Sequence, residues 1–274
     1  MSVKIPTVKE LFKAGAHYGH HRERTDARTH SYVFTYKNKI SIINLEKTRE
    51  MLEEAARLIE EVASKGGKFL FVGSKFQVKD KIEKVAQETG SPYVIERWPG
   101  GLLTNFQEVS KSIKKMIKTQ DDIAQNKYEH LTKRERLEIE KNLKKTETIF
   151  GGLKNLDRKP DLIVIVDAKE EMNALLEAKK AGVKVVALCD TNANPKIVDY
   201  PVILNDDSKA TLEMVLNLFK DAIKANFKQI KTEEEGAESK EKEDSGKKES
   251  EAKEEAVPSK QDDKTTEGKK DKKI

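Results

Sequence analysis

The stretch Leu162-Ile163-Val164-Ile165-Val166 decides the fold class of this chain. Five large apolar residues in a row, without polar alternation, are typical of a strand that is buried on both faces of a parallel sheet. Asp167 follows the run directly, and aspartate readily ends a strand in a turn. The run therefore predicts the central strand of a parallel sheet.

Short apolar runs alternate with amphipathic helices on both sides of this strand. Further strands are expected at Ile40–Ile43, Lys68–Val72, Tyr93–Glu96, Val183–Leu188 and Val202–Leu204. Helices are expected at about 45–65, 74–89, 169–181 and 208–228, with Asn44 and Ser74 as N-caps of the first two. Strands separated by helices favour an α/β fold with a doubly wound parallel sheet, of the flavodoxin-like type.

Residues 104–152 interrupt this pattern and have a helical period instead. Apolar residues recur at alternating three- and four-residue steps from Phe106 to Ile123, and the pattern returns from Ile139 to Phe150. Thr132-Lys133-Arg134-Glu135 has the form of a capping box, so a second helix is expected to begin there. The segment is predicted to be an inserted antiparallel coiled-coil hairpin, whose charged outer faces are either solvated or in contact with RNA or protein.

The expected domains are an α/β sandwich of residues 1–103 and 153–230, the hairpin at 104–152, and a charged tail at 231–274. The tail holds 12 lysines and 15 acidic residues and no aromatic residue, so it cannot bury enough apolar surface to offset ordering and is expected to be disordered. Without it, 41 of the 53 basic and 33 of the 48 acidic residues remain, and residues 1–230 carry a net charge of about +8. A basic body suits nucleic acid or an acidic surface.

Cysteine content and hydropathy bear on the compartment. The single Cys189 excludes an internal disulfide framework and fits a reducing cytosol; a buried, unreactive thiol is expected. No apolar run approaches the twenty or so residues that a membrane span needs. The N-terminus also lacks the apolar core of a signal peptide. We expect a soluble, cytoplasmic protein.

The turn Arg97-Trp98-Pro99-Gly100-Gly101 holds the only tryptophan of the chain. Pro99 has no backbone N–H and the glycine pair relaxes the limits on φ, so the chain must turn here. Trp98 beside Arg97 could stack on a nucleic-acid base, or it could pack in the core and anchor the turn. The second arrangement is the commoner one for tryptophan.

Histidines cluster near the N-terminus at His17, His20 and His21, with His30 close behind. On a helix, His17 and His21 would share a face and could chelate a metal ion. No cysteine accompanies them. We therefore expect no bound metal, and the His17–His21 pair is the one weak candidate.

Several segments, in this order and spacing, together resemble the S-two family of the small ribosomal subunit, in its bacterial form. They are Leu11–His20, Lys37–Thr48, Arg97–Asn105, Pro160–Asp167 and Asp190–Asn192. The resemblance runs from about Thr7 to Ile230 and implies a doubly wound fold, a structural role in translation on the cytoplasmic ribosome, no cofactor and no catalysis. The implied partners are small-subunit rRNA and other small-subunit proteins, including the large first protein of that subunit near the mRNA exit, and no membrane.

The resemblance also implies roles for individual residues. It makes His17, Gly19 and His20 a structural turn close to RNA, and Trp98, Gly100 and Gly101 a second structural turn. Where the family usually has a Trp-Asn-Pro-like element after the first turn, this chain has three arginines, which increases its capacity for phosphate contacts. The residues expected to bind RNA are Arg22, Arg24, Arg28, Lys37, Lys39, Arg97, Lys111, Lys114 and Lys115.

A nucleotide- or phosphate-dependent enzyme is the alternative that the residues leave open. Gly73-Ser74-Lys75 follows a predicted strand and opens a predicted helix, where a phosphate could bind. Asp167, Asp190 and Asn192 lie at the carboxyl ends of predicted strands, where doubly wound folds place their ligands. Neither a Gly-x-Gly-x-x-Gly fingerprint nor a P-loop is completed. The two aspartates are therefore expected to hold turns through side-chain hydrogen bonds.

Overall fold

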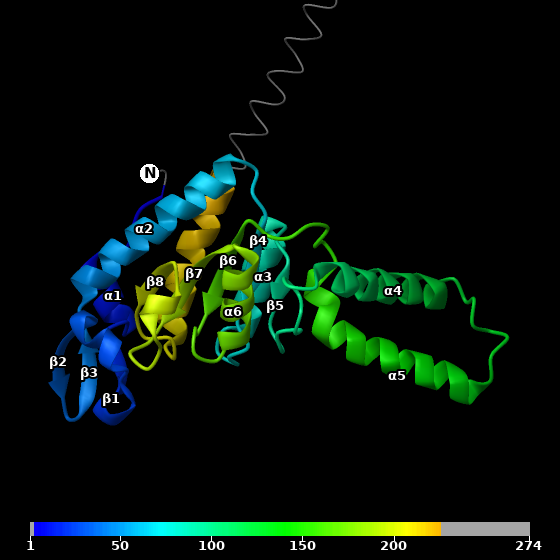
Figure 1. Cartoon of the computed structure of the whole chain (residues 1–274), viewed down its shortest axis with the longest axis horizontal. Helices are drawn as coiled ribbons and strands as arrows, with labels where there is room; N and C mark the ends of the chain where they lie inside the picture. The colour runs from blue at the N-terminus through cyan, green and yellow to red at the C-terminus, as the bar shows by residue number, and fades with distance from the viewer. Residues whose placement is uncertain (1–2, 226–274) are drawn as a thin grey trace, which may run out of the picture. The chain divides into compact units, whose positions relative to one another are not determined.

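Five parallel strands form the central sheet of the computed structural model, which describes residues 3–225 (Figure 1). They are β4 (Phe69–Val72), β5 (Tyr93–Val94), β6 (Leu162–Val166), β7 (Lys184–Cys189) and β8 (Tyr200–Ile203). Neighbouring strands pair in the order β5-β4-β6-β7-β8, and every pair is parallel. The prediction that Leu162–Val166 is the central strand is confirmed, because β6 is the middle strand of this order.

The side chains of β6 explain why both faces of the sheet are covered. All five residues of the strand are buried. Leu162, Val164 and Val166 belong to one apolar core, whereas Ile163 and Ile165 belong to a second one. Successive side chains of a strand point to opposite faces, so the two cores lie on the two sides of the sheet.

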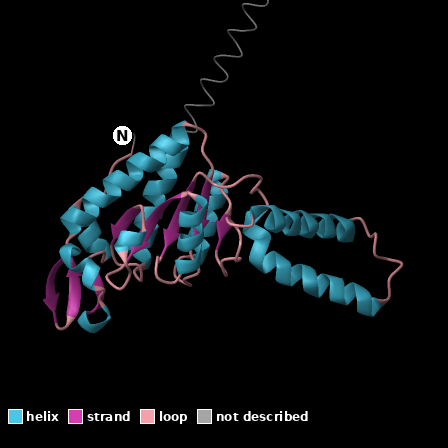
Figure 2. Cartoon of the chain, in the orientation of Figure 1, coloured by secondary structure: helices cyan, strands magenta, loops and turns pink. Residues whose placement is uncertain are grey.

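Helices from several parts of the chain complete the two cores (Figure 2). The first core takes side chains from α2 (Leu45–Ser64), α3 (Lys79–Thr89) and the helical residues 209–225, and the second takes them from α4 (Phe106–Ala124) and α6 (Met172–Ala181). Fully burying one large aliphatic or aromatic side chain contributes roughly 1.5–3 kcal/mol. Helices thus cover both faces of the sheet, as the sequence predicted.

A second, antiparallel sheet lies near the N-terminus. It consists of β1 (Tyr18–His21), β2 (Val33–Lys37) and β3 (Ile40–Ile43) in the order β1-β3-β2. The expectation that Ile40–Ile43 belongs to the parallel series is wrong. A two-residue turn at Asn38-Lys39, with φ values of 50° and 64°, folds β3 directly back onto β2. Such tight hairpin turns need positive φ at both positions and join antiparallel strands without a crossover helix.

Helix starts show which local signals are reliable. The Asn44 side chain accepts a hydrogen bond from the Glu46 N–H at 3.0 Å, so the predicted cap of α2 is confirmed. The predicted cap at Ser74 is wrong, because α3 begins at Lys79 and has no side-chain cap. The Ser74 N–H instead donates to the Glu171 carboxylate at 3.0 Å. Helix α1 (Val8–Ala14) was not anticipated, although a capping box precedes it.

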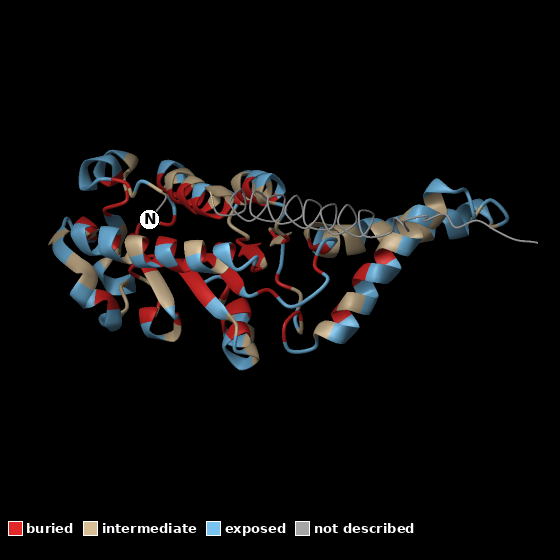
Figure 3. Cartoon of the chain, turned by 90° about the horizontal axis from the view of Figure 1, so that it is seen from above, coloured by how far each residue is buried: buried red, intermediate tan, exposed pale blue. Residues whose placement is uncertain are grey.

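Helices α4 and α5 (Lys133–Phe150) form the insertion. The predicted capping box at the start of α5 is present, since Thr132 and Glu135 bond each other's backbone N–H groups. On α4, Val109, Ile113 and Met116 are buried as the seven-residue pattern predicts. No residue of α5 is buried, and its expected seam positions are half-buried (Figure 3).

Gly152 packs against the backbone of β5 where the insertion returns to the sheet. A Cβ atom at this position would lie 2.3 Å from the Tyr93 carbonyl oxygen, and backbone cannot move aside as a side chain can. We expect Gly152→Ala to lower the free energy of unfolding by about 1–3 kcal/mol, measured by urea denaturation. Gly151→Ala is the matched control, because its Cβ would meet only the Glu147 Cγ at an ordinary 3.5 Å. Equal stability of the two variants would contradict this packing.

Two further expectations concern the C-terminal tail and membrane-spanning helices. The predicted disordered tail at 231–274 lies outside the described residues. Within residues 3–225, no helix has both the length and the apolar composition that crossing a bilayer requires.

Candidate nucleic-acid interface

Arg22, Arg24 and Arg28 lie on one exposed loop between β1 and β2. The loop contains two short 3₁₀ helices, η1 (Arg22–Arg24) and η2 (Ala27–Tyr32), and no α-helix. The Arg22 guanidinium lies over the ring of Tyr36 at 5.2 Å, and the Arg28 Nε is 4.0 Å from an Asp26 carboxylate oxygen. All three side chains are nevertheless exposed, as contacts with a phosphate backbone require.

Lys37, the last residue of β2, and Lys39, on the hairpin turn, are both exposed. The Arg22 N–H donates to the Lys39 carbonyl oxygen at 2.8 Å, which holds the turn against the start of the loop. A backbone hydrogen bond thus joins the loop that carries three of the expected residues to the hairpin that carries two more. We call the five side chains the N-terminal basic surface: Arg22, Arg24, Arg28, Lys37 and Lys39.

The other expected RNA-binding residues lie elsewhere in the fold. Arg97 is exposed after β5, the edge strand farthest in the sheet order from β7 and β8. The N-terminal loop contacts the chain just after β7, at Thr191. Lys111, Lys114 and Lys115 are exposed on α4, where Lys111 pairs with Glu108 at 2.7 Å. The nine predicted residues therefore do not form one continuous site.

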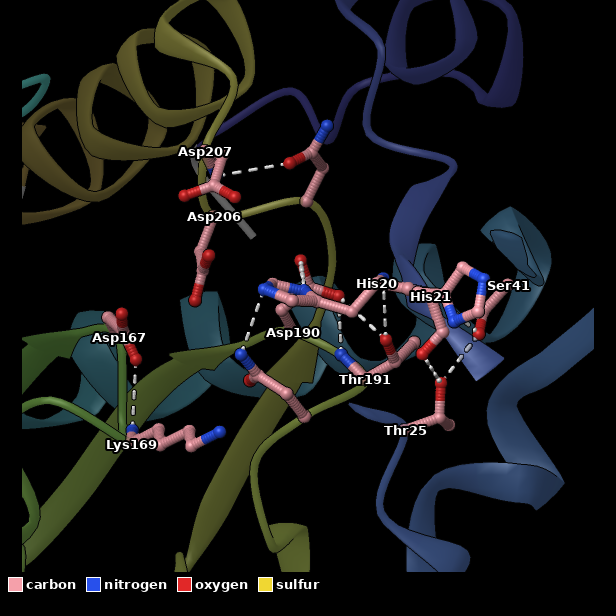
Figure 4. A network of polar contacts seen from close by, with 12 residues as sticks. His20, His21, Thr25, Ser41, Asp167, Lys169, Asp190, Thr191, Asp206 and Asp207 are labelled. Atoms are coloured by element: carbon pink, nitrogen blue, oxygen red, sulfur yellow. Dashed lines mark hydrogen bonds and ion pairs between the residues drawn. The ribbon is translucent and has the colours of Figure 1, made fainter. Parts of the chain in front are cut away.

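The expected turn at His17, Gly19 and His20 is present only in part, because His17 ends a turn whereas Gly19 and His20 lie on strand β1. His20 connects this strand to Asp190 and Thr191, just after β7 (Figure 4). A Cβ on Gly19 would lie 2.7 Å from the Thr191 methyl group, so only glycine permits this approach. The His20 Nδ1 is 2.8 Å from the Asp190 carboxylate, and this hydrogen bond raises the pKa of His20.

The weak metal candidate His17–His21 lacks the shared helical face that it needs, because Tyr18–His21 is a strand and not a helix. The His17 ring stacks on Phe12 at 4.2 Å instead. Among the described residues, the group that could hold a cation is His20, Asp190 and Asp207, whose ligand atoms lie within 4.8 Å of one another. Imidazole nitrogen and carboxylate oxygen are donors that a divalent transition metal accepts.

Carboxylates and one lysine fill the carboxyl end of the parallel sheet. The Lys75 Nζ lies 2.9 Å from Asp167, 2.6 Å from Asp206 and 2.8 Å from Asp207. Burial raises the pKa of Asp206 to about 7. Burial lowers the pKa of Lys75, but its carboxylate contacts outweigh burial and the net shift is upward. Because the lysine is already neutralised by carboxylates, these strand ends do not suit a phosphate.

The smaller expectations for the strand ends are met. The Asp167 carboxylate accepts hydrogen bonds from the N–H groups of Lys169 and Glu170 at 3.0 and 3.1 Å, and Asp190 accepts from the Thr191 N–H. Both aspartates thus hold turns. Cys189 is fully buried, and burial raises the pKa of its thiol, which keeps the reactive thiolate scarce.

Trp98 is only 6% exposed and belongs to the second core. Its Nε1–H donates to a Glu177 carboxylate oxygen at 3.2 Å. The same carboxylate accepts from the N–H groups of Gly101, at 2.7 Å, and Leu103, at 3.1 Å. Gly101 has a φ of 86°, a backbone conformation that favours glycine, whereas a Cβ on Gly100 would point into open space. The turn is therefore built around one glutamate from α6.

Comparison with known proteins agrees with this arrangement. A family model described as ribosomal protein S2 matches residues 11–226. The chain belongs to the ribosomal protein S2 family. It is 39% identical to the small ribosomal subunit protein uS2 of Dehalococcoides mccartyi strain 195 over 221 residues, which cover 80% of this chain and 90% of the relative. The protein of the same name from Porphyromonas gingivalis is 38% identical over 224 residues, covering 82% and 80%.

Membership in the S2 family answers the question that the strand ends left open. This S2 protein is a structural constituent of the small ribosomal subunit that acts in translation, and it is not an enzyme. The lysine–carboxylate cluster around Lys75 is therefore not a catalytic centre.

Several buried polar residues of this S2 protein were missed from the sequence. They are Thr29, Thr191, Asp206 and Glu177, of which the first three are fully buried and the last is half-buried. Asp206 could have been found, because the pair Asp206-Asp207 follows a predicted strand just as Asp167 does. The threonines and the glutamate carry no local signal, since their partners lie far away in the sequence.

Proposed function

We propose that the N-terminal basic surface attaches this S2 protein to the phosphates of small-subunit rRNA. The observation that carries the proposal is the gathering of three exposed arginines and two exposed lysines on one loop and its adjoining hairpin. Each phosphate that such a side chain neutralises releases counterions, so binding should weaken steeply with salt. Arg97 and the α4 lysines Lys111, Lys114 and Lys115 provide separate, weaker contacts.

We propose further that the fold is doubly wound and flavodoxin-like, with a coiled-coil hairpin at 104–152 as its own domain between 1–103 and 153–230. The strand order reverses direction between β4 and β6, as in that fold type. The buried positions Val109, Ile113 and Met116 on α4 support a helical seam. The resemblance to the family alone supports contacts with neighbouring proteins, including the large first protein of the subunit.

Replacing Arg22, Arg24 and Arg28 together by serine should weaken association with small-subunit rRNA and flatten its salt dependence. Losing three phosphate contacts should reduce the slope of log affinity against log salt by about 2–3. The affinity is measured at several salt concentrations, and circular dichroism checks the fold, which should survive because all three side chains are exposed.

The matched control is a triple serine variant at Arg57, Lys65 and Lys180, which are exposed on α2, at its end and on α6. It removes the same charge from other surfaces and should keep the slope closer to that of the unmodified protein. If both variants reduce the slope equally, the charge acts at long range and the N-terminal basic surface has no special role.

Lys39→Gly should make the protein more stable and its RNA contact weaker. A side chain in the left-handed region is strained, so glycine should raise the free energy of unfolding by about 0.5–1 kcal/mol. Loss of one phosphate contact should reduce the salt slope by about 1. Asn38→Gly is the control, because it relieves a positive φ in the same turn without removing a charge. A lysine that faces only solvent would give unchanged binding.

A further inference from the structure

The basic loop carries its charges outward, but two buried threonines hold its backbone. Thr29 and Thr191 are both 0% exposed. The Thr29 hydroxyl shares its one proton between the Asp26 carbonyl oxygen at 2.7 Å and the Thr191 carbonyl oxygen at 2.9 Å. The Asp26 N–H donates to the same Thr191 oxygen at 2.8 Å. One carbonyl group after β7 therefore receives two hydrogen bonds from the C-terminal half of the loop.

Thr191 also holds the other end of the loop. Its hydroxyl oxygen accepts a hydrogen bond from the His20 N–H at 2.9 Å, and its methyl group lies against Gly19 (Figure 4). Arg22, Arg24 and Arg28 thus lie between two attachment points that converge on a single residue, Thr191, in the turn that follows β7.

We propose that Thr29 and Thr191 are positioning residues for RNA binding, which fix the backbone of residues 20–29 so that the three arginines meet phosphates without further ordering. The inference rests on the proposed function, because it concerns how the same surface binds. A loop that is already fixed loses less conformational entropy when it binds, so its affinity for RNA is higher. A loop released from Thr191 keeps its contacts with Lys39 and Ser41, but its C-terminal half must be ordered on binding.

The test uses the full-length chain, transcribed small-subunit rRNA and the variant Thr29→Val, which keeps the shape of the side chain and removes its hydroxyl. We expect about tenfold weaker association with rRNA. The lost hydrogen bond leaves the loop less ordered before binding, and the free energy of one hydrogen bond corresponds to about this factor in affinity. Thr29→Ser, which keeps the hydroxyl, should restore the affinity.

Thr48→Val is a matched control. Thr48 is also 0% exposed, and its hydroxyl also donates to two carbonyl oxygens, those of Asn44 at 3.2 Å and Ile203 at 2.7 Å. Its melting temperature should fall about as far as that of Thr29→Val, but its affinity for rRNA should not change. Equal affinities of the two valine variants would make Thr29 a structural residue and overturn the inference.

A double-mutant cycle with the triple arginine variant shows whether Thr29 acts through the arginines. If it does, Thr29→Val should have no further effect on affinity once Arg22, Arg24 and Arg28 are serine. Additive effects would overturn the inference. Should Thr29→Val fail to fold, Thr191→Val, which loses the acceptor of the His20 N–H, enters the same cycle with the same expectation.

The cycle also separates failure of this inference from failure of the proposed function. An unchanged salt slope in the triple arginine variant means that the three arginines do not contact rRNA, so the proposed function fails for them and the contact would have to lie at Lys37, Lys39 or Arg97. A reduced slope in that variant, with full affinity in Thr29→Val, leaves the proposed function intact and removes only the positioning role.

Discussion

Trp98→Ala is expected to lower the free energy of unfolding by about 3–5 kcal/mol, the range found for large aromatic side chains removed from a core. The ring is 6% exposed and packs with the second apolar core, so its loss leaves a cavity beside the sheet. The Glu177 carboxylate also loses its indole partner. Urea denaturation of the two proteins measures the difference.

Trp98→Phe separates the two causes, because phenylalanine fills much of the space but cannot donate to Glu177. It should be more stable than the alanine variant and less stable than the unmodified protein. A small stability change in Trp98→Ala, together with a large loss of rRNA binding, would instead make Trp98 a contact residue for RNA.

Glu177→Ala is expected to be nearly as harmful, with a loss of about 3 kcal/mol. The carboxylate accepts hydrogen bonds from Trp98 Nε1–H and from the N–H groups of Gly101 and Leu103. Each buried donor left without an acceptor costs roughly 1–3 kcal/mol, and water that reaches this half-buried site reduces the sum. Glu170→Ala is the control, since this exposed glutamate lies just before the same helix. Similar stabilities of the two variants would refute the role of Glu177.

The same carboxylate should also give a pH dependence. Burial raises the pKa of Glu177, but the hydrogen bonds from Gly101, Trp98 and the following N–H groups outweigh burial, and the net shift is downward from 4.5. A lowered folded-state pKa contributes stability that is present above the unfolded value and is lost as pH falls through the folded value. Glu177→Gln should therefore show a smaller loss of stability than the unmodified protein when the pH is lowered below 4.5.

The central sheet could be predicted because its signals are local. The apolar run Leu162–Val166 has no polar alternation, and Asn44 and Thr132 cap helices through residues at most three positions away. The short, mostly apolar segment Ile40–Ile43 fits either kind of sheet, and the deciding feature is the left-handed Asn38-Lys39 turn. Lysine is uncommon at a turn position with a positive φ, so the neighbouring residues do not predict the hairpin.

Only the charged residues of the candidate site could be predicted from the sequence. Arginines and lysines near the N-terminus are visible in the sequence as a cluster, and the structure places five of them, all exposed, on one loop and its adjoining hairpin. What holds that surface is not visible there. Thr29 and Thr191 are 162 positions apart, and Trp98 and Glu177 are 79 apart. A hydroxyl or carboxylate whose partner is so distant has no spacing or period that could reveal it.

The dependence of the N-terminal loop on Thr191 has a consequence for the order of events during synthesis. The contacts of Gly15, His20 and Thr29 with the chain near β7 and β8 span 190, 171 and 162 positions. A chain made from its N-terminus presents the arginines early, but their anchor emerges only after about two-thirds of it has been translated. Contacts of such long range form late in folding, because the entropic cost of bringing distant segments together must be met before the contacts stabilise the fold. If the N-terminal basic surface binds rRNA as proposed, the nascent protein acquires the fixed form of this loop only in the last third of its own synthesis.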